Sequence, residues 1–342
     1  MKVLVTGGTG FVGAHTVAAL IASGHTARLL VRTPSRVAPA LDPLGVTDGV
    51  ETVTGDITDR ASVEAAVDGC DAAIHAAAVV SFDRRNAART SEINVEGTRT
   101  VLGTAWRAGL DPILYVSSVS ALHPPTGPVL TPSSPVTPSS EVYAGSKAAA
   151  ELAARDLQEQ GAPVVITYPG GVWGPHDPNI GESTRGTIWL LRLGIVPQTG
   201  GGYLLVDVRD LGRVHVAALV AGQGPRRYMA GGTWFTGKEL AALVSSVTGR
   251  RIVSTPSPGW SLRATGRIGD RIQSLLKIEL PFTAEGMATI VRSVPTDDVA
   301  THEELGVAWR DPAVTVSDTL RWLLADGHLT RRQVGRRLAD LA

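Results

Sequence analysis

The feature that most constrains this chain is a glycine-rich turn near its N-terminus. The stretch Val3-Leu-Val-Thr-Gly-Gly-Thr-Gly-Phe-Val-Gly13 joins a short apolar run to a helical pattern, with glycines at positions 7, 10 and 13. In a dinucleotide-binding unit the first glycine permits a tight turn, the second lets the backbone approach a pyrophosphate, and the third lets the helix pack on the strand. The free N–H groups at such a helix start bind phosphate with help from the helix dipole. The turn therefore predicts a dinucleotide-binding strand–turn–helix unit; it lacks the Gly-Lys-Ser/Thr of a P-loop.

Further strand patterns alternate with helical patterns through the first half of the chain. Apolar runs typical of buried parallel strands occur at 27–31, 50–53, 71–75, 112–116 and 164–168. Such alternation with short connections is typical of a doubly wound parallel sheet. We therefore predict an α/β fold with a Rossmann core over residues 1–175. A smaller, mixed C-terminal substrate lobe is expected over 176–342, with a segment of about 203–232 returning to the core.

Composition narrows the class of protein. The 342 residues include 32 basic and 32 acidic side chains, so the charge balance does not favour a nucleic acid or an anionic membrane as partner. The single cysteine, Cys70, excludes an intramolecular disulfide and favours a reducing compartment. We find neither an apolar run of membrane-spanning length nor a signal-peptide pattern. We expect a cytoplasmic protein without an integral membrane segment, and a homodimer is compatible with the sequence.

The end of the second strand bears on cofactor choice. An acidic residue there would hydrogen-bond the ribose hydroxyls of NAD, whereas an arginine would pair with the 2′-phosphate of NADP. This chain has Arg32 and Arg36 at that point, and its next carboxylate is Asp42. The alternative interpretation is a pair of solvated arginines on a loop. The pattern favours NADP (NADPH) and leaves NAD as the second candidate.

Residues after the third and fourth strands extend the predicted cofactor site. Asp56 and Ile57 would cap the adenine, with the carboxylate at the exocyclic amine and the aliphatic side chain against the ring. The small residues Ala76-Ala77-Ala78 would leave room for a dinucleotide to cross the sheet edge. We interpret His75, just before them, as a packed and hydrogen-bonded residue rather than a base.

The reactive candidates are Ser118, Tyr143 and Lys147. Tyr143 and Lys147 are four residues apart, so on a helix they lie on one face. An ammonium near a phenol lowers the pKa of the phenol, which can then exchange a proton with a carbonyl or alcohol oxygen during hydride transfer. Ser118 would hold the same oxygen, and Asn94 would complete a proton path through water. Tyr-x-x-x-Lys alone is usually a chance surface pair, but the Ser-Ser strand end and the glycine turn argue against chance. No metal site is predicted.

The order and spacing of these motifs resemble the extended short-chain dehydrogenase/reductase family (the NAD-dependent epimerase/dehydratase superfamily). The similarity is greatest to dihydroflavonol reductase-like and 3β-hydroxysteroid dehydrogenase-like members. The matching pieces cover nearly the whole chain: Thr6-Gly-Gly-Thr-Gly-Phe-Val-Gly13, Gly55-Asp-Ile57, His75-Ala-Ala-Ala78, Asn94-Val-Glu-Gly-Thr98, Val116-Ser-Ser118, Tyr143-Ala-Gly-Ser-Lys147, Pro169-Gly-Gly-Val-Trp-Gly-Pro175, Val208-Arg-Asp-Leu211, Glu304-Leu-Gly-Val-Ala-Trp309 and Thr319-Leu-Arg-Trp322.

The resemblance implies that Ser118, Tyr143 and Lys147 carry catalysis and that Lys147 also holds the nicotinamide ribose. It further implies that the backbone of 169–172 meets the carboxamide. The predicted cofactor-binding residues are then Gly7, Thr9, Gly10, Phe11, Val12, Gly13, Arg32, Arg36, Asp56, Ile57, Ala76, Ala77, Ala78, Ser117, Tyr143, Lys147, Tyr168, Pro169, Gly170 and Val172.

Several positions depart from the family pattern. Tyr168 stands where the family usually has arginine and Trp173 where it has tyrosine, so both are expected to reshape the pocket beside the nicotinamide. Sugar-nucleotide dehydratases carry an Asp-Glu pair for elimination after the serine or threonine, whereas Val119-Ser120 follows Ser118 here. Dehydration is therefore not expected.

Three functional hypotheses follow. The first is an NADP-dependent oxidoreductase that reduces a ketone or aldehyde, or oxidises the alcohol. The second is a nucleotide-sugar epimerase with a retained NAD, in which Arg185, Arg192 or Arg209 would meet a diphosphate. The third is a non-catalytic NADP-sensing regulator, although such sensors tend to lose the Tyr/Lys pair. The loops at 79–90, 122–140 and 176–205 carry no readable substrate code.

One C-terminal pattern is a basic amphipathic helix over 262–280. Ile268, Ile272, Leu275 and Leu276 share one face, and Arg263, Arg267 and Arg271 share another. Such a helix can contact a membrane, but we favour packing on the core.

Overall fold

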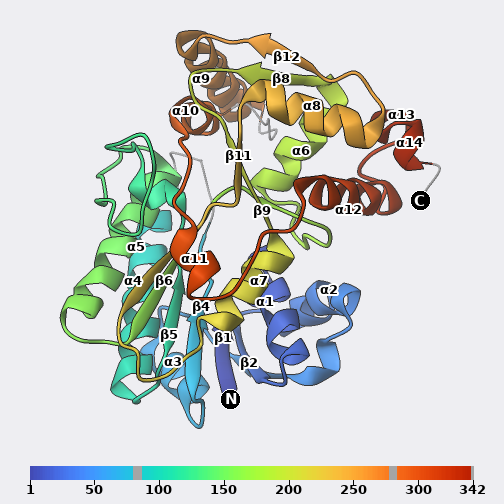
Figure 1. Ribbon diagram of the computed structural model, residues 1–342. Coiled ribbons are helices and arrows are strands. Elements are labelled where there is room, and N and C mark those ends of the chain that lie inside the picture. Colours follow the sequence, from blue (N-terminus) through green and yellow to red (C-terminus); the bar gives the residue numbers. More distant parts are fainter. Residues whose placement is uncertain (80–86, 277–282, 340–342) are drawn as a thin grey trace.

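Seven parallel strands form the central sheet of the computed structural model, which describes residues 1–79, 87–276 and 283–339 (Figure 1). In chain order they are β1 (Lys2–Thr6), β2 (Thr26–Val31), β3 (Val50–Thr54), β4 (Ala72–His75), β5 (Ile113–Val116), β6 (Val164–Pro169) and β10 (Arg226–Ala230). Their spatial order is β3-β2-β1-β4-β5-β6-β10, and every neighbouring pair is parallel. The chain reverses direction across the sheet between β1 and β4, which is where open α/β sheets bind ligands.

Alternating residues of the strands supply two hydrophobic clusters, one on each face of the sheet. On β1, Leu4 belongs to one cluster while Val3 and Val5 belong to the other, as the twofold period of a strand requires. The first face is covered by α3 (Arg60–Val67), α4 (Ala87–Arg107) and α5 (Val142–Glu159); the second is covered by α1 (Phe11–Ala22), α2 (Val37–Leu41) and α7 (Val208–Ala217) (Figure 1). The predicted doubly wound α/β fold is confirmed.

The C-terminal half adds a smaller, mixed structure with a third hydrophobic cluster. Strand β9 (Tyr203–Asp207) pairs in parallel with β7 (Val172–Trp173) and antiparallel with β11 (Thr233–Phe235), and β8 (Ile195–Gln198) pairs with β12 (Val253–Pro256). The remaining helices are α6 (Glu182–Leu193), α8 (Gly237–Thr248), α9 (Gly259–Leu276), α10 (Ala284–Arg292), α11 (Val299–Glu303), α12 (Pro312–Ala325), α13 (Arg331–Val334) and α14 (Arg336–Ala339). Strand β10 lies within the segment expected to return to the core; the division near residue 175 stays a prediction.

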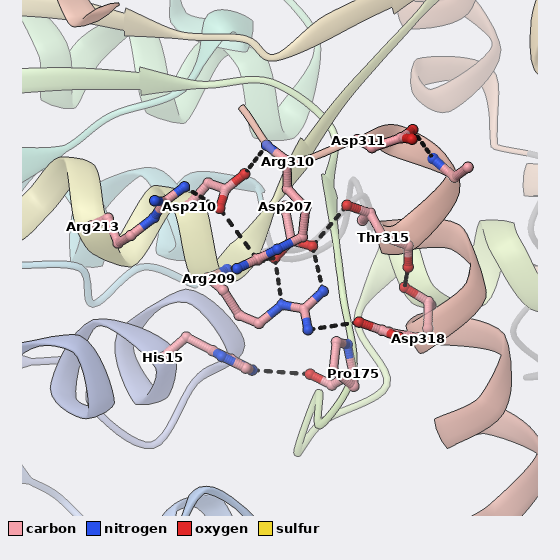
Figure 2. Close-up of polar contacts among 12 residues, drawn as sticks. His15, Pro175, Asp207, Arg209, Asp210, Arg213, Arg310, Asp311, Thr315 and Asp318 are labelled. Carbon is pink, nitrogen blue, oxygen red and sulfur yellow. Dashed lines mark hydrogen bonds and ion pairs between the residues drawn. The ribbon is translucent and has the colours of Figure 1, made fainter. Parts of the chain in front are cut away.

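A buried charge network joins the start of α7 to α12 (Figure 2). Asp207, whose side chain is 1% exposed, accepts two hydrogen bonds from the Arg209 guanidinium, at 2.9 and 2.7 Å. The Thr315 hydroxyl of α12 donates to the same carboxylate at 2.7 Å, and Arg209 also donates to Asp318 at 2.7 Å. The motif beginning at Val208 therefore ties the core to a C-terminal helix.

A second carboxylate extends this network. Asp210 is fully buried and accepts a hydrogen bond of 2.7 Å from Arg213. Its other oxygen accepts the backbone N–H of Arg310, at 2.5 Å, and the Arg310 guanidinium lies 3.2 Å from both Asp207 and Asp210. Residue 310, in the segment before α12, is thus held against the core by two buried acids.

The predicted amphipathic helix forms as α9, but its orientation differs from the expectation. Ile268 is 59% exposed and Ile272 is 36% exposed, so the face that they share does not pack on the core. Leu262, on another face, is buried, and a Cβ on Gly266 would lie 2.6 Å from Ala284 of α10. The helix therefore approaches α10 closely at Gly266. Residues 277–280 of the predicted helix and the side chains of Leu275 and Leu276 lie outside the described part of the chain.

Candidate functional site

The glycine-rich turn lies between the carboxyl ends of β1 and β4. Gly7 has a φ of +77°, and a Cβ there would lie 2.5 Å from the backbone nitrogen of Ala77. A Cβ on Gly13 would lie 2.1 Å from the carbonyl oxygen of Gly7. The N–H of Gly10 donates to that same carbonyl at 2.9 Å. Glycine is required at positions 7 and 13 because the backbone of the turn, of α1 and of the segment after β4 approach one another closely.

The start of α1 has the donor set of an anion site. Gly10 is its N-cap and contributes no side-chain cap, and no acidic residue occupies the first turn. The N–H groups of Phe11, Val12 and Gly13 precede the first residue that can bond within the helix. These amides and the helix dipole suit the pyrophosphate of a dinucleotide. The residues present therefore fit the predicted cofactor at this point.

Two arginines follow β2 at the same edge of the sheet. The charge of Arg32 helps to lower the pKa of Asp56, although the main cause is the backbone N–H of Thr58, 2.9 Å from that carboxylate. Arg36 donates a hydrogen bond of 3.1 Å to the side-chain oxygen of Asn179. Both guanidinium groups are exposed and lie at the loop where a 2′-phosphate is expected.

Asn94 on α4 joins the segment after β4 to α5. Its amide oxygen accepts the N–H of Val79 at 2.8 Å, and its amide nitrogen donates to the Val79 carbonyl at 3.0 Å and to the Ser146 hydroxyl at 3.1 Å. Ser146 in turn donates to the carbonyl of Tyr143 at 2.9 Å. Asn94 is 3% exposed, so these bonds fix the backbone near Tyr143. A water-mediated proton path through Asn94 stays a prediction.

The structure brings the reactive candidates onto adjacent elements. Ser118 caps a short 3₁₀ helix after β5, and its hydroxyl accepts the N–H of Ser120 at 3.1 Å. Its side chain lies close enough to that of Tyr143 to act on the pKa of the phenol. Tyr143 is the second residue of α5, and Lys147 follows one turn later. The Lys147 ammonium donates to the Val116 carbonyl at 3.0 Å. Ser118 and Tyr143 therefore meet, and Lys147 lies on the same helix face, anchored to the end of β5.

Burial dominates the electrostatics of these groups. It raises the pKa of Tyr143; the hydrogen bond with Ser118 opposes this rise, and the charge of Glu285 adds to it. Burial lowers the pKa of Lys147 to about 8, against the opposing charge of Glu151. The pKa of Tyr143 is therefore raised and not lowered as expected, because burial of the phenol is the largest effect and Lys147 is not among its causes.

The comparison with protein families identifies the class of site. The family model described as the NAD dependent epimerase/dehydratase family matches residues 3–231. The chain belongs to this family. The match includes the glycine turn, Ser118, Tyr143 and Lys147, and the family makes the chain an NAD(P)-dependent enzyme.

Individual proteins of this kind are similar to this chain over different shares of its length. A putative dihydroflavonol 4-reductase of Synechocystis is 29% identical over 95% of each chain. A 3β-hydroxysteroid dehydrogenase/Δ5→4-isomerase of Mycobacterium tuberculosis is 34% identical, over 52% of this chain and 48% of its own. The solved structure of a dTDP-glucose 4,6-dehydratase of Streptomyces venezuelae, with NAD bound, is 25% identical, with a TM-score of 0.72 over 94% of this chain and 97% of that one.

Tyr168 departs from the family pattern, and its side chain does not lie in the nicotinamide pocket where it was expected. Its side chain is fully buried between β6 and α5, donates to Glu151 at 2.5 Å and accepts a hydrogen bond from Arg155 at 2.9 Å. The prediction that this side chain reshapes a nicotinamide pocket is wrong, because it points into the core and its hydroxyl is engaged there. Trp173, the other departure, packs against the third hydrophobic cluster.

The glycines after β6 also have a packing reason. A Cβ on Gly170 would lie 2.4 Å from the carbonyl oxygen of Gly231, and a Cβ on Gly171 would lie 2.4 Å from that of Leu204. These glycines let the chain pass between β10 and β9. Contact of the backbone of 169–172 with a cofactor stays a prediction.

The three arginines considered for a diphosphate all have partners within the protein. Arg209 bonds Asp207 and Asp318. Arg192 lies over the ring of Trp189 at 5.5 Å, and Arg185 donates to the carbonyl of Ile180 at 2.8 Å. The interactions of Arg209 in particular leave its guanidinium committed to two carboxylates.

The interpretation of His75 as a packed residue is confirmed. It is 1% exposed and hydrogen-bonds Thr6 at 2.7 Å and Thr98 at 3.3 Å. Burial lowers its pKa to about 3, and the charge of Lys147 adds to this effect. His75 is therefore neutral and joins β4 to β1 and α4.

Sequence reasoning missed one residue beside the site, Glu285. Glu285 on α10 accepts hydrogen bonds from the backbone N–H groups of Tyr143 and Ala144. No local motif links these positions, since 141 or more residues separate them.

Within residues 1–79, 87–276 and 283–339, no cluster of three His, Cys, Asp or Glu side chains is arranged to hold a metal ion. In that same part of the chain, no helix has both the length and the apolar character needed to cross a bilayer.

Proposed function

We propose that this protein is an NADP-dependent reductase of a small ketone or aldehyde, able to oxidise the corresponding alcohol in reverse. The observation that carries the proposal is the proximity of the Ser118 and Tyr143 side chains, with Lys147 one turn further along α5. A relative of nearly full coverage carries the name of a putative reductase, which supports this direction over the other activities of the family.

The roles of the residues follow from their chemistry. When bound, the nicotinamide supplies or accepts a hydride. Ser118 and Tyr143 would hold the substrate oxygen between their hydroxyls, and Tyr143 would donate its proton to that oxygen during reduction. The raised pKa of Tyr143 supports this role, because the phenol remains protonated at neutral pH. Lys147 keeps α5 against the end of β5 and would bind the nicotinamide ribose.

The preference for NADP rests on Arg32 and Arg36. A guanidinium binds a 2′-phosphate through charge-assisted hydrogen bonds. We expect NADPH to bind more tightly than NADH in a fluorescence titration, and Arg32→Ala to reduce the difference by roughly ten-fold. The matched control is Arg60→Ala, since Arg60 is an exposed arginine on α3 paired with Glu64. Equal affinity of the wild type for both nucleotides would refute the NADP assignment.

An epimerase with a retained NAD is the second candidate, supported by the family match and by the NAD in the solved dehydratase. Denaturing the purified protein and identifying the released nucleotide separates the two. NAD in stoichiometric amount would favour the epimerase. NADP, or no nucleotide, together with NADPH oxidation on a panel of carbonyl compounds, would favour the reductase. The third hypothesis, a non-catalytic NADP-sensing regulator, is disfavoured because the chain retains both Tyr143 and Lys147.

A cytoplasmic location and a homodimer belong to the same proposal. The single cysteine, Cys70, is free and partly buried, which suits a reducing compartment. Light scattering on the purified chain would measure its oligomeric state.

A further inference from the structure

The N-terminus of the helix that carries Tyr143 is capped from a distant part of the chain. The N-cap residue of α5, Glu141, makes no side-chain cap hydrogen bond. The N–H groups of Tyr143 and Ala144 instead donate to the two carboxylate oxygens of Glu285, at 3.2 and 2.8 Å. Glu285 belongs to α10 and is 8% exposed. A carboxylate from another helix thus takes the role that an N-cap side chain normally has.

This cap also connects α5 to α9. Ala284, next to Glu285, donates its backbone N–H to Asp270 of α9 at 3.2 Å, and Gly266 of α9 allows the close approach of Ala284. The start of α10 is fixed by its own N-cap, Thr283, which accepts the N–H of Gly286 at 3.0 Å. The position of Glu285 therefore depends on the packing of α9 and α10, and it sets the first turn of α5.

The charge of Glu285 acts at short range on Tyr143. Residues at the start of α5 and on α9 and α10 line a cavity of about 230 Å³. The ionisable groups lining it are Glu141, Arg263, Arg267, Asp270, Glu285 and Arg292. Glu141 is paired with Arg292 at 3.1 Å. Burial raises the pKa of Glu285 and its bonds from the α5 amides oppose this rise. Among the nearby acids, it is Glu285 whose charge raises the pKa of Tyr143.

We propose that Glu285 is a positioning residue that orients the first turn of α5 and, through its negative charge, sets the pH at which Tyr143 releases its proton. The proposal rests on the proposed function only in assigning the proton transfer to Tyr143. The helix dipole favours the carboxylate at this end of α5, while the carboxylate favours the protonated phenol. Glu285 would thereby keep Tyr143 a proton donor.

The test is an ultraviolet titration of tyrosinate in the full-length chain. The signal of Tyr143 is isolated by subtracting the titration of a matched Tyr143→Phe protein from that of each variant. Glu285→Gln removes the charge and keeps an acceptor oxygen for the helix. We expect the Tyr143 transition to move to lower pH by roughly half a unit or more. Glu141→Gln is the control, because Glu141 is the N-cap residue of α5 and its side chain bonds neither of these amides. The Tyr143 transition in this variant should stay at the wild-type pH.

An unchanged transition in Glu285→Gln, or an equal shift in Glu141→Gln, would overturn the proposal. Glu285→Asp retains the negative charge, so in this variant the Tyr143 transition is expected near the wild-type pH. It replaces the Gln variant as the test if that variant fails to fold. A shift in the Asp variant as large as that expected for Gln would also contradict the charge effect. The titration needs no substrate, so it reads the effect of Glu285 even when the proposed reductase activity fails.

With an active substrate in hand, the same variant has a kinetic signature. The alkaline limit of kcat for reduction should move to lower pH in Glu285→Gln, in step with the Tyr143 titration. A fall in kcat that is uniform across pH would indicate loss of structure and would contradict the electrostatic role.

Discussion

The Lys147 ammonium donates a hydrogen bond of 3.0 Å to the carbonyl oxygen of Val116, the last residue of β5. The same ammonium lies 5.2 Å from the centre of the Tyr115 ring. Ser118 follows two residues after Val116, so one buried cation fixes α5, which carries Tyr143, against the strand end that leads to Ser118. Lys147 is 4% exposed, and its burial has a consequence for stability.

The buried Lys147 is expected to make stability depend on alkaline pH. Its pKa falls from 10.5 in the unfolded chain to about 8 in the folded one, so between these values the unfolded state binds more protons. The free energy of unfolding contributed by this group therefore rises with pH from about 8 towards 10.5. Urea unfolding of the wild type and of Lys147→Met at pH 7 and 9.5 measures it. The difference should change by roughly 2 kcal/mol in favour of the wild type at the higher pH. A constant difference would contradict the buried charge.

The close approach at Gly13 predicts a strong effect of a single methyl group. In Gly13→Ala the new Cβ would meet the carbonyl of Gly7, which is backbone and cannot rotate away. We expect a loss of about 1–3 kcal/mol in unfolding free energy and much weaker NADPH binding. Gly186→Ala in α6 is the matched control, because nothing lies within 4 Å of its Cβ position. That variant should bind NADPH normally and gain about 0.5–1 kcal/mol. Equal behaviour of the two variants would disprove the packing argument.

The network around Asp207 predicts a second stability effect. Asp207→Ala would remove the carboxylate with which Arg209 and Arg310 each form an ion pair. It would also remove the hydrogen-bond acceptor of the Thr315 hydroxyl. Breaking such a buried pair costs about 3 kcal/mol. Denaturant unfolding would measure this loss. Glu64→Ala, at an exposed position of α3, is the control and should unfold like the wild type. A loss no larger than that of the control would show that the network does not hold α12 to the core.

The sequence predicted those parts of the protein that depend on local patterns. The alternation of apolar runs predicted the parallel sheet, and the glycines at 7, 10 and 13 predicted the turn between β1 and α1. The small apolar neighbours of His75 predicted its packed state. In each case the residues that decide the structure lie within a few positions of one another, so their spacing carries the information.

The failures concern contacts between distant segments. Tyr168 was expected in the pocket, but its hydroxyl is held by Glu151 and Arg155 in the core. Arg209 was considered for a diphosphate, but it pairs with Asp318, 109 residues later. The helix α9 was expected to pack on the core, yet Ile268 and Ile272 are exposed and the close approach to α10 is at Gly266. No spacing rule encodes such pairings, and the cap on α5 from Glu285 is of the same kind.

The central claim is that Tyr143 donates the proton in an NADPH-dependent reduction. The most direct test is the rate of NADPH oxidation with an active carbonyl compound, measured for the wild type and for Tyr143→Phe after both have been shown to bind NADPH with equal affinity. We expect the rate to be at least about 100-fold lower in the variant. Turnover by Tyr143→Phe at the wild-type rate would contradict it.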